Sequence, residues 1–298
     1  MKLLLTGASG FLGKNILPLL KEKMTVYTLG RDLSNDVVAD LAADVPVLNE
    51  KVDVVLHAAG KAHVVPKTAE EEAEFFRINV EGTKHLCWAL ERIGCPSNFL
   101  FISSVAVYGV DEGKAIAETA PLNGITPYAL SKIEAENFLR EWCMKHQVCL
   151  TILRLPLLAG PCPPGNLGAM IKGISTGKYL SIAGGQAQKS ILMVQDVANV
   201  LPLVLNKGGV YHLCDTETPS FRELEDLIAL QLKKRKPINV PYWVAWILAK
   251  MGDCLGKRAP INTLKLRKIV GTLTFDATKA RQELGWVPMS VMKNFKIK

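Results

Sequence analysis

The sequence has no pair of cysteines spaced C-x-x-C, and its seven cysteines are odd in number and scattered. We therefore expect small buried thiols in a reducing cytoplasm, with neither a disulfide framework nor a metal site. Long hydrophobic runs are also missing, because none approaches the ~18–20 apolar residues of a membrane span. Glycines interrupt the apolar run at the N-terminus, so we do not expect a signal peptide there.

Acidic residues are scarce in the last part of the chain. Residues 231–298 contain 15 lysines and arginines but only 3 acidic residues, and the whole chain carries a net charge of +8. Such a segment suits an anionic ligand or an anionic membrane face, and a solvated basic surface is an equal alternative. No nucleic-acid-binding module is recognisable, so we expect no nucleic-acid partner.

Apolar runs alternate with helix-like segments through the first two-thirds of the 298 residues. The runs are too apolar for a sheet with one wet face. The sequence therefore predicts an α/β fold of the Rossmann type, in which helices cover both faces of a doubly wound parallel sheet. The expected strands are 2–5, 25–29, 52–57, 99–103 and 149–153, and the expected helices are 10–20, 70–93 and 128–145.

Proline and glycine concentrate after Leu157, in LAGPCPPGNLG, and mark a loop that leaves the sheet. We expect a dinucleotide-binding domain over residues 1–160. Residues 161–298 should form mainly a small α/β substrate lobe, with segments near 190–213 returning to the main sheet. Ligands of such folds bind at the strand ends, between sheet and lobe.

A glycine-rich loop follows the first predicted strand and opens the first helix. Its glycines let the backbone approach a pyrophosphate, whose charge the helix N-terminus stabilises. The spacing is G-x-x-G-x-x-G, and the predicted cofactor contacts are Gly7, Gly10, Phe11, Leu12 and Gly13.

The end of the second predicted strand should meet the adenosine ribose of the cofactor. An acidic residue there favours NAD, whereas arginine accepts the 2′-phosphate of NADP. Gly30 stands at the usual place of the acid and Arg31 follows it, which leans slightly toward NADP(H) as the NAD(P) form. Asp32, one residue further on, leaves NAD open.

Tyr128 and Lys132 are four residues apart and therefore share one face of a predicted helix. A nearby ammonium group favours the phenolate, so we expect Lys132 to lower the pKa of Tyr128 toward neutral pH. Ser104 ends a predicted strand and should point its hydroxyl at the same space. The three side chains together suit polarisation of a carbonyl and delivery of a proton.

These residues resemble those of the extended short-chain dehydrogenase/reductases, the NAD-dependent epimerase/dehydratase family, and the resemblance covers nearly the whole chain. The glycine loop and YALSK (128–132) carry part of it. Further motifs are HAAGKAHV (57–64), NVEGT (79–83), SSVAVYG (103–109), RLPLLAGP (154–161), VQDVANV (194–200) and FDATKARQELGWVP (275–288).

The resemblance implies a role for each matching position. Tyr128 would be the proton donor or acceptor, Lys132 would hold the nicotinamide ribose, and Ser104 would bind the reacting oxygen. The other cofactor-binding positions that it implies are Asp40 and Leu41 beside the adenine, and Ala58, Ala59, Gly60, Asn79 and Pro156. The substrate-binding positions that it implies are His63, Ser104, Tyr108, Asn166 and Lys189.

Two departures bear on the reaction. Leu157 stands where UDP-galactose 4-epimerases usually have asparagine, and the sequence around it is more similar to bacterial surface-polysaccharide reductases. The resemblance thus implies 4-keto reduction of a UDP-4-keto-6-deoxy-N-acetylhexosamine. Alternatives are a UDP-hexose 4-epimerase, a reductase of small carbonyl or sterol-like compounds, and a dinucleotide-binding protein without turnover.

The basic C-terminal segment suggests a further partner, since polysaccharide precursors are assembled on membranes. The candidates for lipid contact are Trp243, Trp246 and Ile247. Their spacing fits packing against the lobe core equally well, and we prefer that interpretation. Related enzymes often form homodimers through two long helices, here those containing Asn79 and Tyr128.

Overall fold

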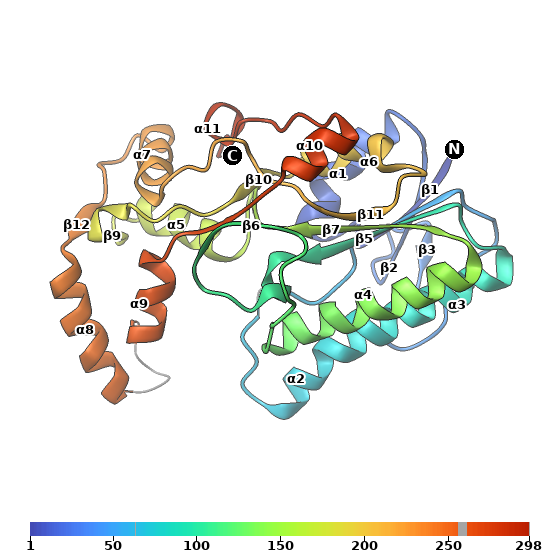
Figure 1. Cartoon of the computed structure of the whole chain (residues 1–298), viewed down its shortest axis with the longest axis horizontal. Coiled ribbons are helices and arrows are strands. Elements are labelled where there is room, and N and C mark those ends of the chain that lie inside the picture. The colour runs from blue at the N-terminus through green and yellow to red at the C-terminus, as the bar shows by residue number, and fades with distance from the viewer. Residues whose placement is uncertain (63, 256–260, 298) are drawn as a thin grey trace.

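The computed structural model describes residues 1–62, 64–255 and 261–297. Its centre is a sheet of seven strands that all run parallel (Figure 1). This confirms the predicted α/β fold class. In spatial order the strands are β11 (Gly209–His212), β7 (Cys149–Leu155), β5 (Asn98–Ser104), β4 (Val54–His57), β1 (Lys2–Thr6), β2 (Thr25–Gly30) and β3 (Val37–Val38).

Helices cover both faces of this sheet, because its strands bury side chains on each side. One face packs against α1 (Phe11–Lys21), α6 (Asp196–Val204) and α10 (Thr278–Leu284). The other packs against α3 (Gly82–Ile93) and α4 (Pro127–His146), which lie side by side across the sheet in Figure 1. The two faces meet different layers, as in a doubly wound fold.

The helix predicted over residues 70–93 is present but changes its winding in the middle. Thr68 caps α2 (Ala69–Phe76) by accepting a hydrogen bond from the Glu71 amide. A π-helical turn, Arg77–Glu81, then leads into α3. Such single π turns are frequent at functional sites because they redirect side chains from a helix. Here the turn carries Asn79.

The chain leaves the main sheet after β7 and builds the C-terminal lobe. The lobe core packs α5 (Gly165–Ser175), α7 (Phe221–Gln231) and α11 (Val291–Asn294) on a pair of strands. Three two-stranded parallel pairs lie outside the main sheet: β8 (Leu157–Ala159) with β10 (Ile191–Met193), β9 (Leu180–Ile182) with β12 (Ile238–Val240), and β6 (Gly113–Ile116) with β13 (Leu273–Phe275).

The segment 190–213, expected to return to the main sheet, divides between the two parts of the molecule. Its first strand, β10, pairs with β8 in the lobe and not with the main sheet. Its helix, α6, packs on the main sheet, and β11 extends the sheet beside β7. The sequence between 190 and 213 therefore joins lobe and sheet.

The lobe ends in α8 (Tyr242–Leu255) and α9 (Thr263–Val270), at the far left of Figure 1. The preferred prediction for α8, packing of its tryptophans against the lobe core, is wrong. Trp243 is 66% exposed, and Trp246 and Ile247 are each 45% exposed. The helix instead packs through Ala245 and Ala249, because these small side chains let α8 approach its neighbours closely.

The expectation of buried cysteines is correct only in part. All seven thiols are free, but Cys162 and Cys254 are exposed, and two others are half-buried. In residues 1–62, 64–255 and 261–297, no helix combines the length and apolarity that crossing a bilayer requires.

Candidate active site

The glycine loop forms a tight backbone cradle between β1 and α1. A Cβ atom on Gly13 would lie 2.2 Å from the Gly7 carbonyl oxygen, and one on Gly7 would lie 2.7 Å from the backbone of Ala58. Gly10 is the N-cap residue of α1 and has no side chain that could accept hydrogen bonds from the amides of the first helical turn. The loop, with Phe11 and Leu12 behind it, therefore leaves amide groups for an anion and fits a pyrophosphate.

At the end of β2, Gly30 provides no carboxylate, and the next residue, Arg31, carries a positive charge. Arg31 is exposed, and its charge acts on Glu74 of α2. Asp32 turns back to its own loop, where it accepts a hydrogen bond from the Ser34 amide at 2.9 Å. The local geometry is compatible with a 2′-phosphate beside Arg31.

Ser104, Tyr128 and Lys132 come together at the carboxyl end of β5. Lys132 lies on α4, and its Nζ donates to the carbonyl oxygen of Ile102 at 2.9 Å. Tyr128 stands one helical turn earlier and hydrogen-bonds to the hydroxyl of Ser104, the last residue of β5. The three groups thus converge at the same edge of the sheet as the glycine loop.

The pKa of Tyr128 contradicts the prediction from its spacing to Lys132. Burial raises this pKa above its usual value, and the hydrogen bond from Ser104 offsets only part of the effect. Burial also lowers the pKa of Lys132 to about 8, against the opposing charge of Glu136. The ammonium group of Lys132 is hydrogen-bonded to the Ile102 carbonyl oxygen. The Tyr128 phenol stays protonated at neutral pH.

Asn79 fixes the loop that follows β4. Its Oδ1 accepts from the Lys61 amide at 2.7 Å, and its Nδ2 donates to the Lys61 carbonyl at 3.1 Å. The same Nδ2 donates to Ser131 Oγ on α4 at 2.9 Å. Gly60 permits this contact, since a Cβ there would lie 3.0 Å from Asn79 Oδ1 and 3.2 Å from Lys132 Nζ.

A buried histidine that the sequence analysis overlooked links the glycine loop to Asn79. His57 Nδ1 lies 2.6 Å from Thr6 Oγ1, and Nε2 lies 2.9 Å from Thr83 Oγ1. Thr83 already donates its hydroxyl proton to the Asn79 carbonyl oxygen, so it must accept from Nε2–H. Burial, with the Lys132 charge second, lowers the pKa of His57 to about 3 and keeps the ring neutral.

A second overlooked feature is the buried carboxylate of Glu136, one turn beyond Lys132 on α4. Arg154 of β7 donates to both carboxylate oxygens, at 3.1 Å through Nε and 2.7 Å through Nη2. Ser103 also donates to it. The spacing of four residues from Lys132 could have indicated Glu136 from the sequence. Nothing in the neighbouring sequence indicated that Arg154 would be its partner.

Tyr108 belongs to this buried network and not to an open pocket surface. Only 1% of it is exposed, and its hydroxyl lies 2.9 Å from Arg154 Nη1 and 2.6 Å from His212 Nε2. The position expected to line the sugar pocket is therefore engaged between β7 and β11. Its ring also stacks on Phe275 of β13.

The remaining predicted positions are divided between the main sheet and the lobe. Asp40 is exposed and caps a turn, whereas Leu41 is buried against α3. The Ala59 amide donates to Thr6 Oγ1, and Pro156 joins β7 to β8. Asn166 is exposed in the first turn of α5. His63 lies outside the described residues.

Lys189 stands on the lobe side, half-buried where residue 189 bridges to Leu273. Burial lowers its pKa, partly offset by the charge of Asp111. Asp111 also pairs with Lys268 of α9 at 3.2 Å. Lys189 and Lys268 together place positive charge near this part of the lobe.

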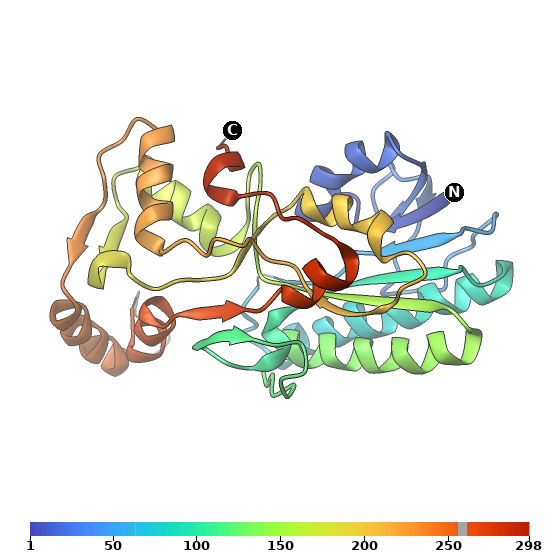
Figure 2. The same cartoon turned by 45° about the horizontal axis from the view of Figure 1, so that its top comes forward.

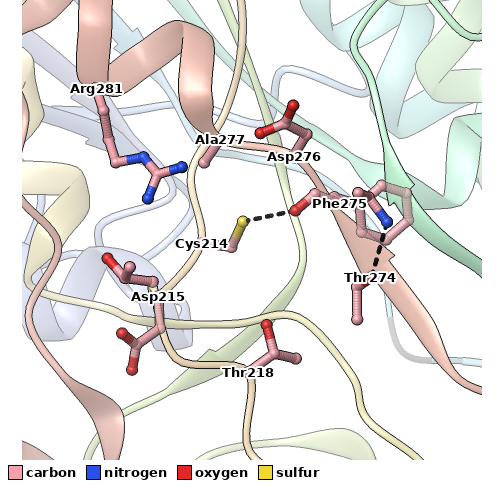
Figure 3. A pocket seen from close by; sticks show the side chains of 10 residues that line it. Cys214, Asp215, Thr218, Thr274, Phe275, Asp276, Ala277 and Arg281 are labelled. Carbon is pink, nitrogen blue, oxygen red and sulfur yellow. Dashed lines mark hydrogen bonds between the residues drawn. The ribbon is translucent and has the colours of Figure 1, made fainter.

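A cavity of about 160 Å³ lies beyond the end of β11, and none of the Ser104, Tyr128 and Lys132 set lines it. Figure 3 shows Asp215, Asp276 and Arg281 around it, with the Cys214 thiol 3.2 Å from the Phe275 carbonyl oxygen. The cavity is therefore separate from the site where Ser104, Tyr128 and Lys132 converge. Across the described ranges, no cluster of histidine, cysteine and carboxylate side chains could hold a metal ion.

Comparison of the fold with solved structures gives several matches over almost the whole chain. A UDP-glucose 4-epimerase from Thermotoga maritima, solved with UDP-glucose, has a TM-score of 0.75 at 21% identity, covering 99% of this chain and 96% of that one. A Pseudomonas aeruginosa protein named RMD, complexed with NADPH, has a TM-score of 0.72 at 23% identity, with the same coverage. At these identities the likeness shows the fold.

Sequence comparison gives relatives of several activities. An Escherichia coli O157:H7 protein named N-acetyl-alpha-D-glucosaminyl-diphospho-ditrans,octacis-undecaprenol 4-epimerase is 28% identical, over 93% of this chain and 87% of its own length. A GDP-6-deoxy-D-mannose reductase from Pseudomonas aeruginosa is 29% identical, over 76% of this chain and 79% of its own. The model of the NAD dependent epimerase/dehydratase family matches residues 3–214, and this chain belongs to that family of NAD-dependent short-chain dehydrogenase/reductase enzymes.

Proposed function

We propose that this enzyme reduces the 4-keto group of a UDP-4-keto-6-deoxy-N-acetylhexosamine with NADPH. The observation that carries the proposal is the convergence of Tyr128, Ser104 and Lys132 at the carboxyl end of β5, at the same edge of the sheet as the glycine cradle. A protonated phenol at neutral pH suits delivery of a proton to a carbonyl oxygen. That is the direction of a reduction.

A nicotinamide cofactor held by the glycine cradle and Lys132 would supply a hydride for C4 of the sugar. The Tyr128 hydroxyl donates its proton to the C4 oxygen as the carbonyl double bond breaks. Ser104 holds that oxygen through its hydroxyl. The proposed function of Lys132 is to hold the nicotinamide ribose.

The proposed cofactor preference rests on the end of β2. Arg31 forms no ion pair with any described residue, and Asp32 accepts a hydrogen bond from the Ser34 amide of its own loop. A guanidinium group recognises a phosphate in a bidentate manner. A reductase also benefits from exchangeable NADPH, because each turnover consumes one reduced cofactor.

The direct test follows NADPH oxidation with a UDP-4-keto-6-deoxy-N-acetylhexosamine. We expect one NADPH consumed for each 6-deoxy-N-acetylhexosamine formed. The same incubation with UDP-sugars that have an intact C4 hydroxyl serves as control and should consume none. If the enzyme instead inverts C4 of those UDP-sugars and retains NAD through purification, the reductase proposal is wrong.

A second candidate function is 4-epimerisation of a diphosphate-linked N-acetylhexosamine. The observation that favours it is the match to a relative named as a 4-epimerase of such a sugar over 93% of this chain. The same three side chains would then serve removal and return of the hydride at C4. An inversion assay with a diphosphate-linked N-acetylhexosamine, carried on either UDP or a polyprenol, separates the two functions.

A further inference from the structure

Helix α8 turns its large apolar side chains away from the protein. Trp243, Trp246, Ile247 and Met251 recur at spacings of three and four, so they share one side of the helix. All are exposed, Trp243 by 66% and Met251 by 62%. Tyr242 and Leu248 widen this exposed surface. We call these six residues, with Lys250, the α8 face.

The inward side of the same helix uses only small residues. Ala245 and Ala249 are buried against Leu266 of α9 and against partly buried side chains of β9 and β12. A surface helix normally reverses this arrangement and buries its large side chains. The contact between α8 and the lobe is thus complete without the tryptophans, which indicates that they serve another contact.

The α8 face carries one positive charge, and a basic run lies before it on the far side of β12. Lys250 lies within this face, with its Nζ 5.6 Å from the Trp246 ring centre. Lys233, Lys234 and Arg235 are exposed just before β12, which leads into α8, and no acidic partner is found for them among the described residues. The one acidic residue of α8, Asp253, accepts from the Thr263 amide and hydroxyl instead.

We propose that the α8 face is a docking surface for an anionic lipid bilayer. Tryptophan and tyrosine favour the level of the lipid headgroups, where their rings are buried and their polar atoms stay hydrated. An amphipathic helix with flanking lysines lies in that plane rather than crossing the bilayer. In Figures 1 and 2, α8 lies at the end of the molecule opposite the N-terminus, where a flat surface can reach it.

Charge favours the bilayer over a second copy of this chain. A symmetric dimer through this surface would bury both Lys250 groups in a largely apolar contact, and the α8 face contains no acidic residue to pair with either. An anionic bilayer instead supplies the missing negative charge. The docking goes beyond the proposed reaction and does not depend on it, since none of the candidate catalytic groups lies on α8.

Sedimentation of the full chain with lipid vesicles tests the proposal. We expect binding to vesicles of equal parts phosphatidylcholine and phosphatidylglycerol, and little to phosphatidylcholine alone. The triple variant Lys233→Glu, Lys234→Glu, Arg235→Glu should bind roughly a hundredfold more weakly, because each basic residue near such a surface contributes about fivefold. Trp243→Ser with Trp246→Ser should lose at least about tenfold from the apolar area no longer buried.

Two controls separate docking from general attraction of a basic protein. Trp88→Ser removes a tryptophan that is 41% exposed on α3, and Lys23→Glu with Lys51→Glu and Lys145→Glu removes exposed charge from the dinucleotide-binding domain. Both should bind like the parent protein. Equal losses in the controls, no binding to anionic vesicles, or an α8-dependent dimer that ignores vesicles would overturn the proposal.

Discussion

The side-chain amide of Asn79 pairs with both backbone polar groups of Lys61, accepting from its amide at 2.7 Å and donating to its carbonyl at 3.1 Å. Asn79 thus makes the two backbone hydrogen bonds that a neighbouring strand would make. It holds the loop after β4 against the π-helical turn. Asn79 also donates to the side chain of Ser131, which lies on α4 one turn after Tyr128. This bond ties that turn of α4 to the same loop. Through Ser131, Asn79 therefore fixes the part of α4 that carries Tyr128 and Lys132.

Replacing Asn79 by alanine should therefore loosen the site. We expect Asn79→Ala to leave buried polar groups unpaired, to destabilise the protein by about 1–3 kcal/mol, and to lower kcat more than it raises KM. Urea unfolding and steady-state kinetics measure the two effects. Asn294→Ala is the matched control, since it removes an exposed amide-to-carbonyl bond remote from the site. Equal kinetics in both variants would contradict this role.

The buried ion pair between Glu136 and Arg154 should matter far more than the neighbouring exposed one. Glu136→Gln leaves the Arg154 charge unpaired, so we expect a loss of about 3–5 kcal/mol in the free energy of unfolding. Arg140, which is half-exposed and 3.5 Å from the same carboxylate, is the control, and Arg140→Gln should cost less than about 1 kcal/mol. Similar losses for the two variants would refute the distinction.

Glu136 should also affect the titration of Lys132, because its negative charge raises the pKa of that lysine. Removing the charge in Glu136→Gln should lower the pKa further. The alkaline limb of the kcat profile, where the ammonium group is lost, should then move to lower pH. A variant with an unmoved limb would show that Glu136 acts on stability alone.

His57 predicts a loss of stability in acid. The folded pKa is about 3 against an ordinary value of 6.5, so below 6.5 the unfolded chain gains a proton that the folded protein does not. Stability from this group is full above pH 6.5 and falls toward pH 3, by at most about 1.4 kcal/mol per pH unit. Urea unfolding of His57→Gln should show a shallower acid slope and a constant offset from the parent above neutral pH. Parallel slopes would contradict the assignment.

Arg31 should decide the choice of dinucleotide. We expect Arg31→Ala to weaken NADPH binding about tenfold to a hundredfold, since it removes a charged hydrogen-bond donor from the 2′-phosphate. NADH binding should not change, and Lys23→Ala, at the opposite end of β2, should alter neither. Fluorescence titration with both cofactors measures this. An equal effect on NADH would show that Arg31 does not recognise the phosphate.

The main sheet could be predicted because buried parallel strands leave continuous apolar runs in the sequence. The run expected at 2–5 is β1, and the run expected at 99–103 lies within β5. Strand β3 has only two residues, which is too short for any periodic signal. Strand β10 has the composition of a buried strand, but composition does not say which neighbour it pairs with.

The site was predictable where a motif is local and hidden where it depends on distant contacts. The spacing of Tyr128 and Lys132 places them on one helix face, but the degree of burial, which raises the Tyr128 pKa, is set by tertiary packing. Tyr108 and His212 meet across 104 positions of sequence. In α8, periodicity showed which residues share a face and not whether that face is buried.

Deuteride transfer tests the central claim most directly. The enzyme is incubated with NADPH deuterated at the transferable position and with a UDP-4-keto-6-deoxy-N-acetylhexosamine, and the product is analysed by mass spectrometry and NMR. We predict one deuterium at C4, and in Tyr128→Phe a rate lower by about a hundredfold or more with unchanged NADPH binding. Product without deuterium at C4, or full activity in Tyr128→Phe, would contradict the account.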